Sequence, residues 1–434
     1  MTDGTVWILA VTFLGCLALN VPIAVSIGIA TVVTMLAAIP VGPALATAAL
    51  RMATGIDSFA LLAIPFFILS GQLISQGGMA QRLIDFAKTL VGGFAGGLAY
   101  VNVLASMFFG TISGSAVAAT SAVGGFMIPS MEEEGYEREH SVAVTMTGSV
   151  TGLLIPPSNV LIVYSLASGG VSIAALFVAG YVPGILLGLG LMLVAGVVAL
   201  RRGYPVAGRS NLAEGVRAFF RALPSLLLIV IVMGGIVAGI FTATEASAIA
   251  VVYSLILAVL VYREVRVRDL FGIFLKSTET TAIVMLLIAT STALSWILSY
   301  ENIPQDLTAF LLSLTESRIL ILLFINLLLL AVGTFMDITP AVLIFTPIFL
   351  PVAQQLGISS LHFGIMMVLN LCIGLCTPPV GSILFVGCGI GRTTIPRTTK
   401  ALLPFYAVMV LMLFLVVYLP WLSEALPRSL GYGF

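Results

Sequence analysis

The sequence predicts an all-α polytopic membrane protein, built as an inverted repeat with two re-entrant helical hairpins and two broken transmembrane helices, as in ion transporters. Three observations support this fold class. The 434 residues are 60% hydrophobic and 8% charged, with a mean hydropathy of +1.19, whereas soluble domains are about 25% charged. Apolar segments long enough to cross a bilayer recur along the chain. The residues that interrupt them recur at one spacing in both halves.

Composition also excludes several classes of protein. Eighteen Lys and Arg balance eighteen Asp and Glu, so no charge excess indicates a nucleic-acid partner. The four cysteines lie within apolar segments, and neither a disulfide framework nor a metal site of cysteines is expected. The N-terminal apolar run has no basic residue before it and no small-residue cleavage pattern after it. We interpret it as a first span and not as a signal peptide.

The first half of the chain is a series of apolar segments. They run roughly over residues 6–19, 23–39, 59–74, 141–168 and 173–200, with an amphipathic piece at 82–90 and a pair of half-length segments between them. Segments 94–109 and 117–129 are each too short to cross a core of about 30 Å at about 1.5 Å per residue. They predict a re-entrant hairpin over about 94–130. The sequence IPPSN at 155–159 interrupts the segment 141–168, which predicts a broken helix.

A polar, basic stretch at 201–222 divides the chain and is predicted to be a cytoplasmic linker. The full-length segments of the second half cover residues 223–240, 246–262, 281–298 and 402–422, with a polar, partly amphipathic piece at 299–318. Two half-length segments predict a second hairpin over about 319–351. Residues 361–390 predict a second broken helix, interrupted by CTPPVG at 376–381.

The two halves, residues 1–200 and 223–434, follow the same plan. A Gly-Thr turn, the end of a hairpin, the loop after it and the break in a helix all recur 222 or 223 positions apart. The matching residues are Gly110 and Gly333, Pro129 and Pro351, Gly135 and Gly357, His140 and His362, Gly152 and Gly374, and Pro156-Pro157 and Pro378-Pro379. Internal repeats of this kind are typical of secondary transporters.

The distribution of basic residues predicts the orientation. If the N-terminus lies outside, fifteen of the eighteen Lys and Arg fall in cytoplasmic segments, and only Arg51, Arg318 and Arg428 fall outside. This asymmetry follows the positive-inside rule. The first hairpin then enters from the cytoplasm and the second from the opposite face, so the repeats are inverted. Both chain termini are predicted to be on the outer side.

The four breaks are predicted to form one composite site. Backbone broken at membrane depth leaves N–H and C=O groups unpaired, which is tolerated only where protein, water or a ligand satisfies them. Freed carbonyls can coordinate Na⁺, whereas helix N-termini favour an anionic substrate. Asp337 is the one carboxylate in the breaks, and a carboxylate at that depth costs roughly 2.5 to 3.5 kcal/mol. Thr339, before Pro340, is predicted to cap the helix that follows.

The breaks provide carbonyls, hydroxyls and a carboxylate, the ligands that hard cations prefer. The residues expected to bind Na⁺, the only metal predicted, are Gly110, Ser113, Ser115, Pro156, Asn159, Gly333, Asp337, Thr339, Cys376, Thr377 and Gly381. The residues expected to bind the substrate are Ser113, Ser115, Ser158, Asn159, Thr339 and Thr377. Because no Lys or Arg lies in the breaks, an anionic substrate would be held by helix N-termini, hydroxyls and co-bound cations. No cofactor is expected beyond Na⁺ as the coupling ion.

Simpler interpretations remain for single residues. Gly and Pro in the breaks could only kink closely packed helices, and Asp337 could be a structural cap. Glu245 and Asp57 are expected to be interfacial caps, and His140 and His362 to be structural. The sequence contains no GxxxxGK[ST], HExxH or GxSxG motif. Active transport would therefore depend on an ion gradient, and the protein is not expected to be an enzyme.

Five stretches together resemble the large membrane subunit of TRAP (tripartite ATP-independent periplasmic) transporters. They are GTISGSAVAATSAVGG from Gly110, GLLIPPSNVLIVYSLASG from Gly152, FTATEASAIA from Phe241, GTFMDITPA from Gly333 and GLCTPPVGSILFVG from Gly374. The resemblance covers nearly the whole chain. It implies an elevator-type, Na⁺-coupled symporter in the bacterial inner membrane, whose cation sites lie at the hairpin tips and the facing helix breaks.

The resemblance also implies partners. A small four-helix membrane subunit would be a separate chain, and a periplasmic solute-binding protein would deliver an organic acid such as sialic acid or a C4-dicarboxylate. The alternatives are a stand-alone Na⁺/dicarboxylate symporter of similar fold, which would need no binding protein, and an ion channel lined by the breaks. A membrane enzyme is disfavoured because no nucleophile and base pair lies among the breaks.

Overall fold

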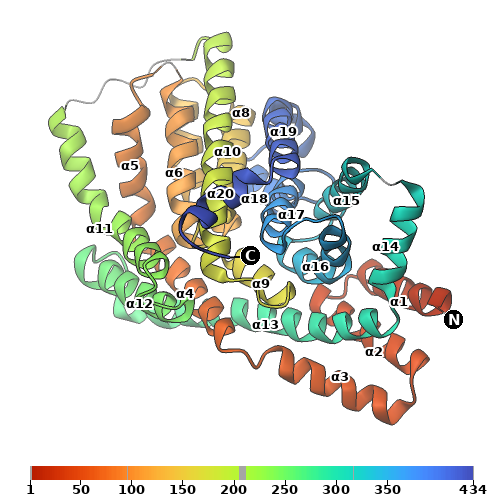
Figure 1. The fold of residues 1–434 in the computed structure, drawn as a ribbon. Coiled ribbons are helices and arrows are strands. Elements are labelled where there is room, and N and C mark those ends of the chain that lie inside the picture. Colours follow the sequence, from red (N-terminus) through yellow and green to blue (C-terminus); the bar gives the residue numbers. More distant parts are fainter. Residues whose placement is uncertain (1, 95, 205–211, 316, 434) are drawn as a thin grey trace.

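The computed structural model describes residues 2–94, 96–204, 212–315 and 317–433. Every regular element in these ranges is a helix (Figure 1), which confirms the all-α class. The first half contains α1 (Thr2–Ala18), α2 (Ile23–Ala38), α3 (Val41–Gly55), η1 (Phe59–Leu62), α4 (Ala63–Gln76), α5 (Met79–Val91), α6 (Gly97–Ser113), α7 (Ala116–Glu133), α8 (Arg138–Val150), η2 (Thr151–Leu153), α9 (Asn159–Ala167) and α10 (Ile173–Arg202).

The second half repeats this order. It contains α11 (Leu212–Val237), α12 (Ala243–Leu255), η3 (Ile256–Val261), η4 (Val267–Asp269), α13 (Leu270–Tyr300), α14 (Ile303–Leu314), α15 (Arg318–Gly333), α16 (Ile338–Gln355), α17 (Ser360–Leu375), α18 (Ser382–Ile390), α19 (Ile395–Tyr418) and α20 (Trp421–Ser429). Equivalent helices begin in register: the N-caps of α10 and α19, Ser172 and Thr394, are 222 positions apart.

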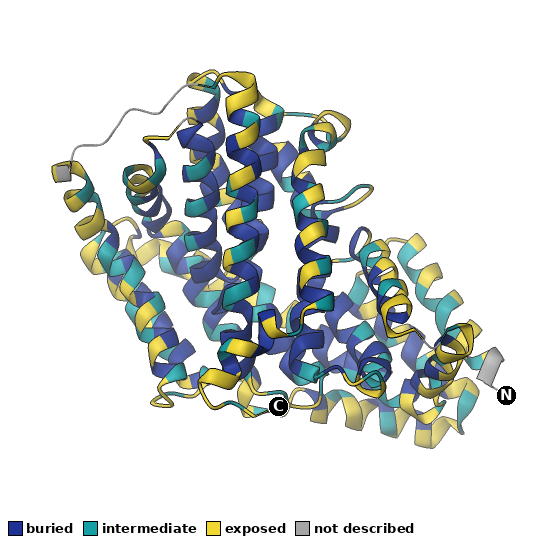
Figure 2. Ribbon diagram, turned by 45° about the horizontal axis from the view of Figure 1, so that its top comes forward, coloured by how far each residue is buried: buried dark blue, intermediate teal, exposed yellow. Residues whose placement is uncertain are grey.

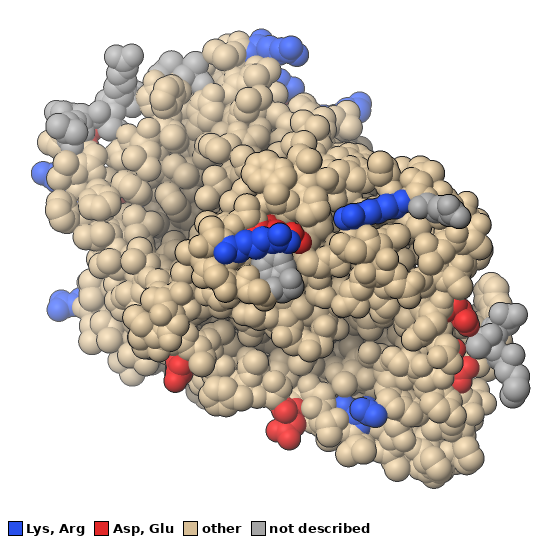
Figure 3. Space-filling view, in the orientation of Figure 1, with Lys and Arg blue, Asp and Glu red and all other residues tan. Residues whose placement is uncertain are grey.

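Seven helices in the described part of the chain are long and apolar enough to cross a membrane. They are Phe59–Gln76, Ile173–Arg202, Ala213–Val237, Ala243–Val261, Val267–Tyr300, Ile338–Gln355 and Ile395–Tyr418. Figure 3 shows a face that is mostly uncharged, with a few charged side chains scattered over its middle and its margins. The lengths, the composition and this surface are those of a multi-pass membrane protein.

Three segments differ from the sequence prediction. The helix α3 was not predicted, because its alanine-rich sequence lacks a strong apolar run, although Ala44 and Ala48 are buried. The helix α13 begins at Leu270, well before the expected span at 281–298. The helices α10 and α11 extend into the predicted linker at 201–222. Residues 205–211 of that linker, including Arg209 of the predicted cytoplasmic set, lie outside the described residues.

The predicted hairpins are pairs of helices, and their second arms are longer than expected. The helix α7 continues through Pro129 to Glu133, and α16 continues through Pro347 and Pro351 to Gln355. The sequence predicts that these arms end at Pro129 and Pro351. Each of these arms has 18 residues, because the polar residues after the proline continue the helix. Whether the hairpins re-enter the membrane remains a prediction.

The helices pack in an interleaved order. On the left of Figure 1, α11, α5, α6 and α10 stand side by side, while α13 runs across below them. The helix α4 packs against α12, and α2 packs against α13. These two contacts are equivalent under the repeat, and each joins one half of the chain to the other.

The two broken helices form the centre of the core. All residues of α8 from His140 to Val150 are buried, as are all residues of α17 from Leu361 to Leu375. Burial on every side of a helix means that protein surrounds it completely. Figure 2 shows the same pattern, with dark blue helices inside and yellow residues on the outer ones.

Candidate functional site

A cavity of about 210 Å³ lies where the two hairpin tips meet both broken helices and two flanking helices. Its lining is contributed by α4 (Ile64, Ile68, Gly71 and Gln72), the first tip (Ser113 to Ala118), the first broken helix (Leu153, Asn159, Val160 and Val163), α13 (Thr280 and Val284), the second tip (Asp337 to Thr339) and the second broken helix (Leu375 and Ile383). Residues from both halves therefore share one cavity, as the repeat predicts.

The first hairpin tip is a sharp turn that presents two hydroxyl groups. Gly114 has a φ of +61° and donates its N–H to the Gly110 carbonyl at 2.8 Å. The Ser113 hydroxyl donates to the Ser115 carbonyl at 3.3 Å. The Ser115 hydroxyl oxygen caps α7 by accepting from the Ala118 N–H at 3.3 Å. Each hydroxyl oxygen keeps a lone pair that a cation in the cavity could use.

Asn159 supplies an acceptor beside this tip. It is the first residue of α9, and its side-chain amide lies so close to Gly114 that a Cβ there would be 3.1 Å from Nδ2. The Asn159 Oδ1 is buried and has no hydrogen-bond partner in the described residues. A buried amide oxygen without a partner is unusual in proteins. It is therefore available to a ligand in the cavity.

The second tip carries the carboxylate. Asp337 is exposed on the cavity wall, and its Oδ1 accepts a hydrogen bond from the Ser382 hydroxyl at 3.3 Å. The Thr334 carbonyl accepts from the N–H groups of Val380 and Gly381 at 3.2 and 3.1 Å. Backbone bonds thus join the second tip to the break in the second transmembrane helix.

The predicted cap of this helix was wrong. The sequence indicated Thr339, but α16 begins at Ile338 and its N-cap is Asp337, whose side chain makes no capping bond. Pro340 is then in the first turn, where its missing N–H removes no helical bond. The Asp337 carboxylate is consequently free to face the cavity, while Thr339 also lines it.

Glycine pairs hold each tip against its neighbouring broken helix. A Cβ on Gly152 would lie 2.3 Å from the Gly110 Cα, and a Cβ on Gly374 would lie 2.6 Å from the Gly333 Cα. Such distances are far below van der Waals contact, so only glycine permits this approach of two backbones. The structure therefore gives Gly110 and Gly333 a packing role next to the cavity.

The other predicted site residues lie in the breaks behind the cavity wall. Ser158 donates its hydroxyl to the Leu153 carbonyl at 2.6 Å, and Thr377 donates to the Ile373 carbonyl at 2.7 Å. The Cys376 carbonyl accepts from the Tyr406 hydroxyl at 2.5 Å. The predicted residues that do not line the cavity are Gly110, Pro156, Ser158, Gly333, Cys376, Thr377 and Gly381. The Pro156-Pro157 and Pro378-Pro379 peptide bonds are both cis.

Sequence reasoning missed several residues of the site. Gln72 lies within the predicted apolar segment 59–74 and was not predicted as a site residue. A glutamine within such an apolar segment is itself an indication of a polar cavity. Gly71, beside it, packs so closely on the first tip that a Cβ would lie 2.7 Å from the Ser113 carbonyl oxygen. Ser382 directly follows the second break, and only its contact with Asp337 reveals its role.

The electrostatics of the cavity are simple. The residues that line it include one carboxylate, Asp337, and no Lys, Arg or His. Four helices begin at this point: α7 after Ser115, α9 at Asn159, α16 at Ile338 and α18 next to Ile383. Their N-terminal ends carry partial positive charge. No group of three His, Cys, Asp or Glu able to hold a metal occurs in the described ranges.

Two predicted structural roles are confirmed. Glu245 forms a capping box with Thr242: its carboxylate accepts from the Thr242 N–H at 2.8 Å, and the Thr242 hydroxyl accepts from the Glu245 N–H at 3.2 Å. His362 is buried, with Nδ1 at 2.7 Å from the Ser423 hydroxyl. Neither residue lines the cavity.

Comparison with known proteins gives matches along nearly the whole chain. The family model of the tripartite ATP-independent periplasmic transporter, DctM component, matches residues 10–422. An uncharacterized protein, YgiK, of Salmonella typhimurium is 53% identical, with 95% of this chain and 94% of the other covered. The C4-dicarboxylate TRAP transporter large permease DctM of Rhodobacter capsulatus is 39% identical, with 95% and 96% covered.

The sialic acid TRAP transporter large permease SiaM of Vibrio cholerae is 38% identical, with 89% of this chain and 90% of the other covered. Among solved structures, the YdaH transporter of Alcanivorax borkumensis matches with a TM-score of 0.62 over 88% of each chain. Its sequence identity is 14%, so this likeness concerns the fold alone.

Proposed function

The chain belongs to the DctM family, the large permeases of TRAP transporters, and from this premise we propose that it imports an organic acid together with Na⁺. Members of this family are secondary transporters of organic acids. The observation that carries the proposal is the cavity shared by the two hairpin tips, in which Asp337, Asn159 and two serines present oxygen atoms. Coupling of this transport to Na⁺ goes beyond what family membership establishes and is part of the proposal.

The ligands favour a monovalent hard cation. Hydroxyl, amide and carboxylate oxygens suit Na⁺, which needs no nitrogen or sulfur ligand. The first tip offers neutral oxygens from Ser113, Ser115 and Asn159, whereas the second offers the charged Asp337. We propose one cation position at each tip. The position next to Asp337 should bind more tightly, because its formal negative charge attracts the ion directly.

An organic acid would bind where the helix N-termini converge. Without Lys or Arg on the cavity wall, a carboxylate has the positive ends of four helices and the bound cations to stabilise it. Ser115, Thr339 and Gln72 line the same wall and can donate hydrogen bonds. Substrate binding would then require the cations, and this dependence couples the two fluxes.

We propose that the substrate crosses by an elevator movement. The hairpins and broken helices, whose tips are joined by close glycine contacts, would move as one body. The helices α4 and α13 carry the opposite wall of the cavity and pack on α12 and α2, so they would form the fixed scaffold. The amphipathic helices α5 and α14 would connect the two parts.

The proposed partners are a small four-helix membrane subunit and a periplasmic solute-binding protein that delivers the acid. The curated relatives are named for C4-dicarboxylates and for sialic acid, and these are the substrate classes proposed for this chain. The proposed location is the bacterial inner membrane, with both termini on the periplasmic side.

Reconstitution tests this function. The full chain, the small subunit and the cognate binding protein are placed in proteoliposomes, and uptake of a labelled organic acid is measured with and without an inward Na⁺ gradient. The proposal expects saturable uptake that needs both the gradient and the binding protein. Uptake by the chain alone would instead indicate a stand-alone symporter. Flux that does not saturate with substrate would indicate a channel.

A further inference from the structure

A second cavity, also of about 210 Å³, opens far from the hairpin tips, at the end of α8, α10 and α19. Its lining is contributed by His140, Val198, Arg201, Arg202, Lys400, Ala401 and Pro404. Three cations and an imidazole therefore surround a cavity whose remaining wall is apolar. None of these residues belongs to the proposed transport site.

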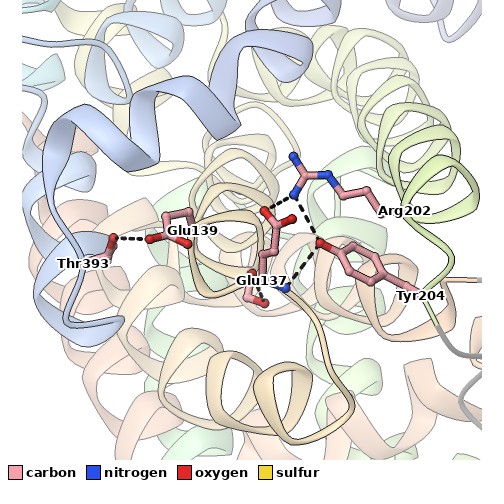
Figure 4. Close-up of polar contacts among 6 residues, drawn as sticks. Glu137, Glu139, Arg202, Tyr204 and Thr393 are labelled. Carbon is pink, nitrogen blue, oxygen red and sulfur yellow. Dashed lines mark hydrogen bonds and ion pairs between the residues drawn. The ribbon is translucent and has the colours of Figure 1, made fainter.

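The charges around this cavity do not cancel. Arg202 is paired with Glu137, and both contact the Tyr204 hydroxyl, as Figure 4 shows. Glu139 lies on the other side of Glu137 and accepts a hydrogen bond from Thr393 at 3.4 Å. Arg201 and Lys400, both exposed at the mouth, have no carboxylate partner in the described part of the chain. The lining cations, less the one paired with Glu137, therefore carry about two positive charges.

His140 forms the floor of the cavity. Its side chain is 1% exposed, and its Nε2 is buried without a hydrogen-bond partner among the described residues. The rings of Tyr204 and Phe405 pack beside it, with centroids 5.5 and 5.8 Å from that of His140. It also lies in the first turn of α8, where the helix dipole favours an anion.

The matching position in the second repeat is built differently. His362, the counterpart of His140, has both ring nitrogens within hydrogen-bond distance of partners: Ser423 at 2.7 Å and the Val417 carbonyl at 3.4 Å. Glu424 occupies the register position of Arg202 and accepts from the Ser359 hydroxyl at 2.5 Å. The short helix α20 contributes Ser423 and Glu424. The open cationic cavity is therefore specific to the first repeat, and symmetry alone does not explain it.

We propose that this cavity binds a phosphate group, with His140 Nε2–H donating to one oxygen and Arg201 and Lys400 neutralising its charge. Free phosphate carries nearly two negative charges at neutral pH and a phosphodiester headgroup carries one, so the two unpaired cations can neutralise either group. Arginine recognises phosphate oxygens with well-directed donors. Basic cavities between membrane helices are suited to the headgroups of anionic lipids. Either such a headgroup or free phosphate could supply this group.

The two histidines of the chain make a direct test possible. The full chain is labelled with ¹⁵N-histidine and with ¹³C-carbonyl glutamate, because Glu139 precedes His140 whereas Leu361 precedes His362. Solid-state NMR then measures dephasing of each imidazole nitrogen by ³¹P. The sample begins in a phosphorus-free maltoside detergent and receives phosphatidylglycerol, phosphatidylcholine or inorganic phosphate.

We expect ³¹P dephasing at His140 and none at His362. Dephasing with phosphatidylglycerol but not with phosphatidylcholine identifies an anionic lipid headgroup as the source, and dephasing with inorganic phosphate identifies a soluble one. No dephasing in any sample, or equal dephasing at both histidines, would overturn the proposal.

Two charge-matched variants extend the test. The double variant Arg201→Gln and Lys400→Gln removes the unpaired cations. The apparent affinity for the probe that dephases His140, either phosphatidylglycerol or inorganic phosphate, should then fall at least tenfold. Arg397→Gln with Lys276→Gln removes the same charge from exposed positions outside the cavity and should leave that affinity unchanged. Equal losses in both variants would show that the probe responds only to net charge.

Discussion

The Ser382 hydroxyl donates a hydrogen bond of 3.3 Å to Asp337 Oδ1, and this bond links the second hairpin tip to the start of α18. The carboxylate also lies on the cavity wall, where a cation could reach it without the side chain being reoriented. The bond therefore fixes the position of the negative charge in the proposed transport site.

Asp337→Asn should weaken the Na⁺ dependence of uptake. The substitution keeps the size and removes the charge, so the Na⁺ concentration for half-maximal uptake should rise tenfold or more, which corresponds to about 1.4 kcal/mol. Proteoliposomes containing all the partners give this value. Asp306→Asn, on the exposed face of α14, is the matched control and should leave it unchanged. An unaltered Na⁺ response in the Asp337 variant would refute the ligand assignment.

Asn159→Ala should reduce Na⁺ affinity with little effect on stability, because the Asn159 Oδ1 makes no bond inside the described protein. Asn370→Ala provides the opposite case. Its amide donates to the carbonyl and the side chain of Asn326, both at 2.8 Å, and losing a buried bond of this kind costs about 1 to 3 kcal/mol. We expect a lower melting temperature for Asn370→Ala and unchanged Na⁺ affinity. If Asn159→Ala lowers only stability, its oxygen has a structural role.

Gly152→Ala should destabilise the protein, since its Cβ would lie 2.3 Å from the Gly110 Cα. Overpacking of this kind costs about 1 to 3 kcal/mol, and Gly374→Ala should behave likewise. Gly125→Ala is the control, because nothing lies within 4 Å of its Cβ. That change should be neutral or stabilising, by up to about 1 kcal/mol. Thermal unfolding of the detergent-solubilised chain separates the two outcomes.

Orientation can be tested with single cysteines. In a Cys16→Ser background, the remaining native cysteines are buried. Arg392→Cys should react with an impermeant thiol reagent only from the cytoplasmic side, and Arg51→Cys only from the periplasmic side. Both positions are exposed. The reverse labelling pattern would invert the predicted topology and exchange the faces on which the two hairpins lie.

The fold class and the repeat could be predicted from the sequence because both depend on periodic, local signals. Apolar length identifies most helices, and residues such as Gly110 and Gly333 reveal the register. The helix α3 was missed because alanine gives good helix propensity without high hydropathy. The sequence predicts too short an α7, because proline usually ends a helix. Surrounding helices can, however, support a proline such as Pro129 within a membrane helix.

The site was predictable only in part. Ser113, Ser115, Asn159, Asp337 and Thr339 were expected and line the cavity. The roles of Gln72 and Ser382 depend on contacts between segments distant in sequence, and no local pattern encodes such contacts. The predicted cap at Thr339 was wrong because Pro340 fits the first turn of a helix that is capped by either Thr339 or Asp337. The helix begins at the earlier position, with Asp337 as its N-cap.

The interleaved packing of the halves has a consequence for how the chain is made. The helix α4 packs on α12, and α2 packs on α13, so α2 and α4 enter the membrane before these two partners have been synthesised. These helices remain incompletely packed in the bilayer until the second repeat has been inserted. The packing between the two halves is therefore completed only near the end of translation.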